Sequence, residues 1–110
     1  MGLVTSSAST NNHNLYFSKD ELAKILNLYS LGVSNGEWKD YAIDFNKNNA
    51  FFYIFKHSLA SPECVLNKSF EKKKRKISFR LKSKNQNKKY ESLDLLLSSL
   101  NRKIFKILDR

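Results

Sequence analysis

The sequence predicts an α+β fold in one domain, with an N-terminal helix, a four-stranded antiparallel meander and a C-terminal helix (α-β-β-β-β-α). Three observations predict it. Residues 40–45 alternate, with Tyr41, Ile43 and Phe45 on one side, which is typical of a half-buried strand. Residues 50–55 are apolar at nearly every position, as in an inner strand buried on both faces. Apolar residues recur at helical spacing before and after these strands.

The first helix is expected to begin after Ser18. A serine at this position can cap the free backbone amides of the first turn, and Glu21 can reach back to complete a capping box. Gly32 or Gly36 is expected to end the helix. Its buried stripe consists of Leu22, Ile25, Leu26, Tyr29 and Val33.

Four strands follow, and their expected positions are about 39–46, 50–57, 63–70 and 76–83. A loop is expected at 58–62, because Pro62 donates no backbone hydrogen bond. A basic turn, Glu71–Arg75, separates the third strand from the fourth. The polar run 84–89 is expected to be a second turn, after which the C-terminal helix begins at Glu91 or Ser92.

Composition indicates one domain in a reducing compartment. The chain has 110 residues, of which 1–15 are expected to form a disordered tail and 16–110 the domain. Its single cysteine, Cys64, excludes an internal disulfide. No run approaches the ~18 apolar residues that a membrane helix needs, and no export signal is present. We therefore expect a cytoplasmic protein without a membrane partner.

The positive charge is concentrated in one segment. The formal net charge is +10, and residues 68–89 hold 11 basic residues against the single acid Glu71. The remainder of the chain is therefore neutral.

No set of residues suited to catalysis or metal binding emerges. Asp40 and Asp44 lie on one side of a strand but roughly 13 Å apart, which exceeds the ~5–9.5 Å of paired glycosidase carboxylates. A nucleophilic Cys64 with His57 as its base would lack a third group to orient the histidine. With His13, these residues are also too few for a zinc site. We expect a protein that is not an enzyme and needs no cofactor.

The aromatic hairpin is the first candidate for binding. Its side chains face both sides of the sheet, whereas the helices can cover only one. The leading interpretation is therefore an interaction module that binds an unknown protein or a second copy in a homodimer. For Trp38, a place at the edge of the core is the alternative. The expected contact residues are Trp38, Tyr41, Phe52 and Tyr53.

The basic segment 68–89 gives an alternative, nucleic-acid binding. Adjacent cations gain by lying near phosphates, because each contact releases condensed counterions. Phe52 could stack on bases if it lies on the same sheet face. A solvated charged turn is the other interpretation of this run, and a small enzyme with an unrecognised site is a third hypothesis for the chain. The expected nucleic-acid contacts are Lys72, Lys73, Lys74, Arg75, Lys76, Arg80 and Lys82.

The order of several segments resembles a small bacterial family called domain of unknown function 2794. The segments are FSKDEL (17–22), ILNLY (25–29) and GEWKDYAIDF (36–45), and the ending LDR (108–110) is also similar. The resemblance is most specific over residues 17–57, while residues 63–90 are far richer in Lys and Asn than the family. It implies a bacterial cytoplasmic domain and supplies no activity, substrate or cofactor.

Overall fold

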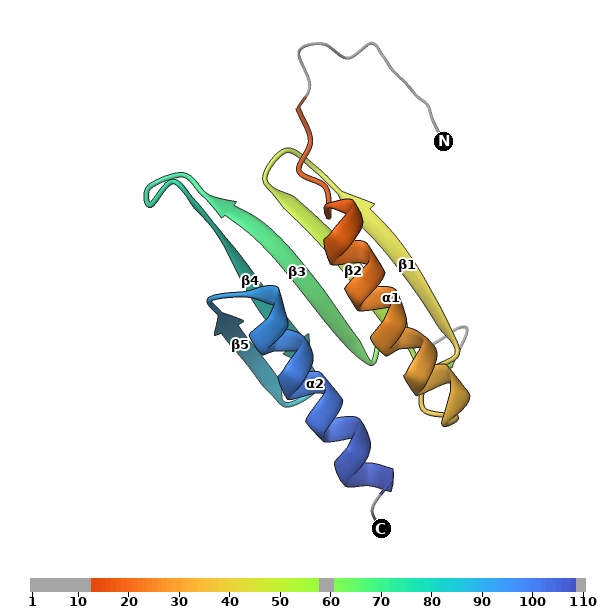
Figure 1. Ribbon diagram of the computed structural model, residues 1–110. Coiled ribbons are helices and arrows are strands. Elements are labelled where there is room, and N and C mark those ends of the chain that lie inside the picture. The colour runs from red at the N-terminus through yellow and green to blue at the C-terminus, as the bar shows by residue number, and fades with distance from the viewer. Residues whose placement is uncertain (1–12, 58–60, 109–110) are drawn as a thin grey trace.

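The structure is a computed structural model that describes residues 13–57 and 61–108 (Figure 1). Along the chain, one helix precedes and one helix follows five antiparallel strands. The strands lie in the sheet in the order β1-β2-β3-β4-β5, so the sheet is a meander. Both helices lie on the same face of the sheet, α1 over β1 and β2 and α2 over β4 and β5. The elements are α1 (Lys19–Ser34), β1 (Asp40–Phe45), β2 (Asn49–Phe55), β3 (Cys64–Glu71), β4 (Lys76–Ser83), β5 (Gln86–Tyr90) and α2 (Leu93–Leu108).

The predicted α+β domain is confirmed, and the sheet has one more strand than expected. Residues 86–90, predicted as part of a turn, form β5, which pairs with β4 from Ser83↔Gln86 to Phe79↔Tyr90. The turn is only Lys84 and Asn85. Because β5 is an edge strand with a single neighbour, it tolerates polar and charged side chains and shows no apolar alternation. The prediction of four strands was therefore wrong.

Helix α1 begins with the predicted capping box. The Ser18 hydroxyl accepts a hydrogen bond from the Glu21 amide at 3.1 Å, and the Glu21 carboxylate accepts one from the Ser18 amide at 2.7 Å. Beyond the helix, the chain turns at Gly36, whose φ of +78° suits glycine. Trp38 then folds back against Gly32 in the last turn of α1. The capping box thus defines the first turn of α1, and the packing of Trp38 on Gly32 holds the last turn against the return loop.

The core lies between the sheet and the two helices. Phe52 on β2 is directly paired with Ile43 and Leu66, so it points to the helix side and is fully buried. Trp38 is also buried, with 7% of its surface exposed. The interpretation that places Trp38 at the edge of the core is therefore confirmed. The alternative role of Trp38 and the predicted role of Phe52, both in partner binding, were wrong, because both side chains are buried beneath α1. The remaining core residues include Ile25, Leu28, Ile54, Leu66, Phe79, Leu81, Leu96, Leu100 and Ile104.

Burial along β2 alternates rather than extending to both faces as expected. Ala50, Phe52 and Ile54 are buried, whereas Phe51, Tyr53 and Phe55 are half-buried. This pattern follows from the two helices lying on one side of the sheet.

Residues 1–12 of the predicted tail and 58–60 of the predicted loop lie outside the described part of the chain. Within the described part, the Leu15 amide donates to the Asn46 carbonyl at 2.8 Å. None of the described helices is both long and apolar enough to cross a membrane.

Candidate binding face of the sheet

The helix-free face of the sheet is the candidate site. Residues paired directly across strands point to the same side, so the register assigns every side chain to one face. The helix-free face consists of Asp40, Ala42 and Asp44 on β1, Asn49, Phe51, Tyr53 and Phe55 on β2, Val65, Asn67, Ser69 and Glu71 on β3, Lys76, Ser78, Arg80 and Lys82 on β4, and Asn87 and Lys89 on β5.

An apolar strip runs along the middle of this face. The rings of Phe51 and Tyr53 stack with centroids 5.8 Å apart and planes 24° from parallel. Val65 is paired with Tyr53 on the neighbouring strand. A hollow of about 360 Å³ opens beside these rings. It is lined by Phe51, Tyr53, Val65, Asn67, Arg80, Lys82 and Asn87.

Charges of opposite sign border the strip. Asp40 and Asp44 lie on β1, and Arg80 and Lys82 lie on β4, three strand spacings or roughly 14 Å away. Each aspartate accepts a hydrogen bond from the backbone amide of the next residue at 2.8 Å. Arg80 donates to the neutral side chain of Asn87 at 3.0 Å. None of the four charges forms an ion pair with a residue in the described ranges.

The positive charge of Lys89 on β5 is compensated by Glu71 on β3. Its ammonium nitrogen lies 2.7 Å from a carboxylate oxygen of Glu71. The hydrogen bonds from Lys89 and, next in effect, from Ser78 lower the pKa of Glu71 from about 4.5 to about 2. The free positive charge of this face is therefore on β4 rather than on β5.

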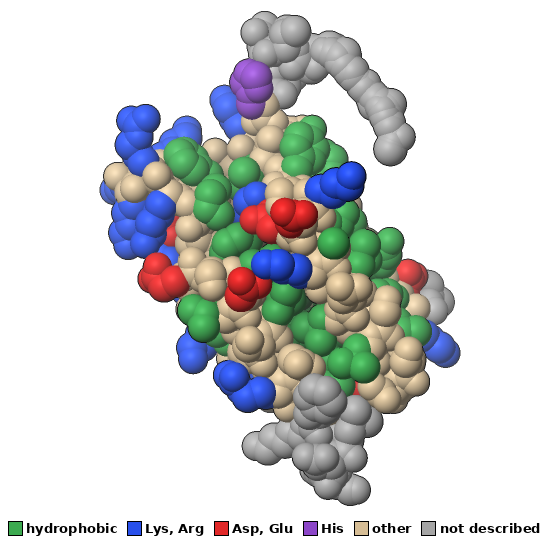
Figure 2. All heavy atoms as spheres, in the orientation of Figure 1, with side chains coloured by type: hydrophobic (Ala, Val, Ile, Leu, Met, Phe, Trp, Pro, Cys, Tyr) green, Lys and Arg blue, Asp and Glu red, His purple; other side chains and the backbone are tan. Residues whose placement is uncertain are grey.

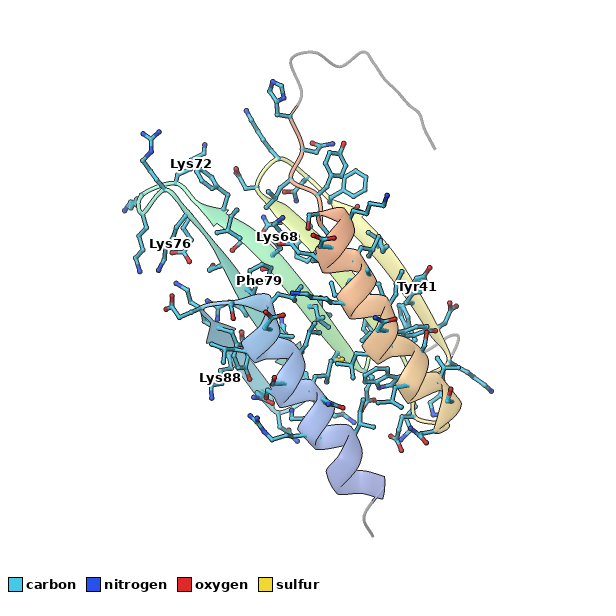
Figure 3. The ribbon with its side chains drawn as sticks, in the orientation of Figure 1. Tyr41, Lys68, Lys72, Lys76, Phe79 and Lys88 are labelled. Carbon is cyan, nitrogen blue, oxygen red and sulfur yellow. The ribbon has the colours of Figure 1, made fainter. Side chains whose placement is uncertain are left out.

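Residues 72–75 of the basic turn join β3 and β4 and are exposed. Figure 2 shows Lys and Arg side chains gathered over this end of the molecule, and Figure 3 shows Lys72 and Lys76 there. Lys76, Arg80 and Lys82 are separated by even numbers of residues along β4, so all three basic side chains lie on the helix-free face. All seven predicted nucleic-acid contacts are exposed, and the buried Ser78 separates Lys76 from Arg80 and Lys82 on this face of β4.

Lys68 does not belong to that surface, although it begins the basic segment. Only 8% of its surface is exposed, and it lies between the sheet and the start of α1 (Figure 3). Its ammonium donates to the Glu21 carboxylate and to the Tyr16 carbonyl, both at 2.8 Å. The assignment of Lys68 to the basic binding segment was wrong, because its charge is already paired inside the fold.

The predicted partner contacts do not lie together. Tyr41 is 38% exposed, but it points to the helix side and stacks on Phe52 with centroids 4.9 Å apart. Of the four, only Tyr53 is on the helix-free face. Sequence reasoning missed Phe51 and Phe55, and their separation by two residues from Tyr53 was the signal that could have found them.

Cys64, the candidate nucleophile, is buried on the helix side of the sheet. A hollow of about 460 Å³ on the helix side is lined in part by Cys64, Glu37, Glu63 and Lys103. Burial raises the pKa of the Cys64 thiol to about 12, which keeps it protonated and a poor nucleophile. No three potential metal ligands cluster among the described residues.

A family model described as "Protein of unknown function (DUF2794)" matches residues 15–95. The chain belongs to this family. No curated protein and no solved structure matches it. The DUF2794 match includes α1 and all five strands, so it contains the entire helix-free face. The resemblance identified from the segments between residues 17 and 45 is thus confirmed.

Proposed function

We propose that this DUF2794 protein is a non-enzymatic binding module and that its contact surface is the helix-free face of the sheet. One observation carries the proposal: both helices pack on one face, while the strip formed by Phe51, Tyr53 and Val65 has no cover from the described chain. Covering such a strip gains about 25 cal/mol per Å² of apolar surface before the costs of association. The proposal includes the cytoplasmic location expected from the single cysteine.

Photo-crosslinking in cells that produce the protein naturally tests this proposal. A benzoylphenylalanine placed at Tyr53 should yield cross-linked species. The same group at Leu95, which is 54% exposed on α2, is the matched control and should not. Equal cross-linking at both positions, or none at position 53, would contradict a binding role for the helix-free face.

Nucleic acid is a second candidate for the same face. Arg80 and Lys82 line the same hollow as Phe51 and Tyr53, and Lys76, next to the basic turn, lies on the same face of β4. Aromatic rings stack on exposed bases with about 1–3 kcal/mol per base, while neighbouring cations follow the phosphates. This arrangement favours a single strand over a duplex, whose bases are already stacked.

Fluorescence anisotropy with a single-stranded oligonucleotide over a series of salt concentrations tests this second candidate. Log affinity should fall with log salt by roughly 0.7 per phosphate contacted. Replacing Arg80 and Lys82 with Gln should weaken binding and flatten the slope. Replacing the exposed Lys19 and Lys47 with Gln removes the same amount of charge elsewhere on the protein. This control should change the affinity and the salt slope less. Equal effects of the two pairs would reject a specific role for the helix-free face.

A further inference from the structure

We infer that the partner of the helix-free face is a second copy of this chain. The two copies are related by a two-fold axis that lies in the interface between the two sheets, parallel to the strands and above the gap between β2 and β3. The inference rests on the proposed function, since it names the partner for the same face. The observation that supports it is the distribution of acidic and basic residues across this face, which the strand register determines.

The register places complementary residues in rows across the sheet. Asp44 is paired with Phe51, Phe51 with Asn67, and Asn67 with Arg80. One row therefore has an acid at its β1 end and a base at its β4 end. The neighbouring row reads Ala42, Tyr53, Val65 and Lys82 in the same order.

Rotation by 180° about this axis places the helix-free faces of the two copies against each other. Each row of one copy then lies opposite the same row of the other copy. The rotation places β1 of each copy over β4 of the other and β2 over β3. Asp44 of each copy then faces Arg80 of the second copy, and Tyr53 faces Val65. The contact uses the same patch twice, as a closed two-fold dimer requires, and near-aligned strands are a usual packing of two sheets.

The charges select this axis over the other two-fold arrangement. An axis in the interface but perpendicular to the strands would place β1 over β1, and would bring Asp44 near Asp44 and Arg80 near Arg80. Like charges across an interface cost several kcal/mol, so complementarity of this kind determines orientation. Asp44 and Arg80 have no ion-pair partner within the described chain, and each gains one in the dimer.

The dimer is small and reversible. Four strands at about 4.8 Å and six residues at about 3.3 Å span roughly 400 Å² of each copy, which is below the ~800 Å² per partner of a standard interface. The axis also places both basic turns at one end of the dimer, where they repel. Association is therefore expected in the micromolar range at 0.15 M salt or above, where the Debye length is about 8 Å or less.

A charge-reversal cycle tests the arrangement. Sedimentation velocity over a range of protein concentrations measures the dissociation constants of the natural protein, of Asp44→Arg, of Arg80→Asp and of the double variant. Each single reversal should weaken the dimer at least tenfold, and the double reversal should restore it to within about threefold. Asp20→Arg with Arg102→Asp, both exposed on the helices, is the control and should leave the constant unchanged. Circular dichroism verifies that each variant is folded.

The outcomes separate this inference from the proposed function. A folded double variant that stays as weak as the single variants overturns the two-fold arrangement. A natural protein that remains monomeric at millimolar concentration overturns the second copy as partner; position 53 could then still cross-link to another molecule, and the proposed function would stand. Cross-linked species that disappear after nuclease treatment would identify nucleic acid instead.

Discussion

The ammonium nitrogen of Lys68 lies 2.8 Å from the carboxylate oxygen of Glu21 that also accepts the Ser18 amide. One carboxylate therefore caps α1 and joins the helix to β3. Lys68 further donates to the Tyr16 carbonyl, so it binds the chain just before the helix as well. This junction helps to hold α1 on one face of the sheet, which leaves the opposite face open.

Replacing Lys68 with Met should lower the free energy of unfolding by about 2 kcal/mol, because two hydrogen bonds to a largely buried charge are lost. Urea unfolding measures the change. Lys72→Met, in the exposed basic turn, is the matched control and should stay within about 0.5 kcal/mol of the natural protein. A similar loss for both variants would mean that the Lys68 contacts contribute little.

The sequence predicted those features that depend on near neighbours. The capping box joins Ser18 and Glu21, which are three residues apart, and the strand expected at 76–83 coincides with β4. Lys68 was misplaced because its partner Glu21 is 47 residues away, and no local pattern shows that a lysine in a basic run is buried.

The candidate site could be predicted only in part, for the same reason. A run such as AFFYIF is apolar at nearly every position, so it does not show which of Phe51 and Phe52 faces the helices. The register with β1 and β3 decides it. β5 was not predicted, because Gln86–Tyr90 is mostly polar and shows no apolar alternation. An edge strand of this kind is identified by its pairing with a neighbouring strand rather than by its own side chains.

Replacing Gly32 with Ala should destabilise the protein by about 2 kcal/mol, as overpacking of a tight core does. A Cβ at this position would lie 2.7 Å from Cδ2 and Cζ3 of the Trp38 indole, closer than real contacts allow. Urea unfolding measures the loss. Combining Gly32→Ala with Trp38→Leu should cost less than the sum of the two single changes, because the smaller side chain removes the clash. Strict additivity would contradict the contact.

Glu71 should stabilise the fold in a way that depends on pH. Hydrogen bonds from Lys89 and Ser78 hold its pKa near 2 in the folded protein, against about 4.5 ordinarily. A lowered folded pKa means that the contribution is present above about pH 4.5 and is lost as the pH falls towards about 2.

The Tm difference between the natural protein and Glu71→Gln should therefore be largest above about pH 4.5 and shrink towards about pH 2. Thermal unfolding followed by circular dichroism at several pH values measures it. Glu91→Gln, a more exposed acid near Lys76, is the control. A difference for Glu71→Gln that does not change with pH would show that Lys89 and Ser78 do not hold the charged form.

Arg75 is the residue of the basic turn with a strained backbone. Replacing it should distinguish the effect of backbone strain on the free energy of unfolding from the effect of charge repulsion. Its φ of +52° is in the left-handed region, which costs a residue with a Cβ about 1–2 kcal/mol. Arg75→Gly removes this strain but loosens the unfolded chain by about 0.4–1 kcal/mol. The free energy of unfolding should therefore rise by about 0.5 kcal/mol in urea titrations. Lys73→Gly removes a charge from the same turn at a residue without a positive φ, so it should be destabilising by about 0.5 kcal/mol. If both glycine variants were stabilised equally, repulsion among the cations, rather than the backbone of Arg75, would be the source of strain in the turn.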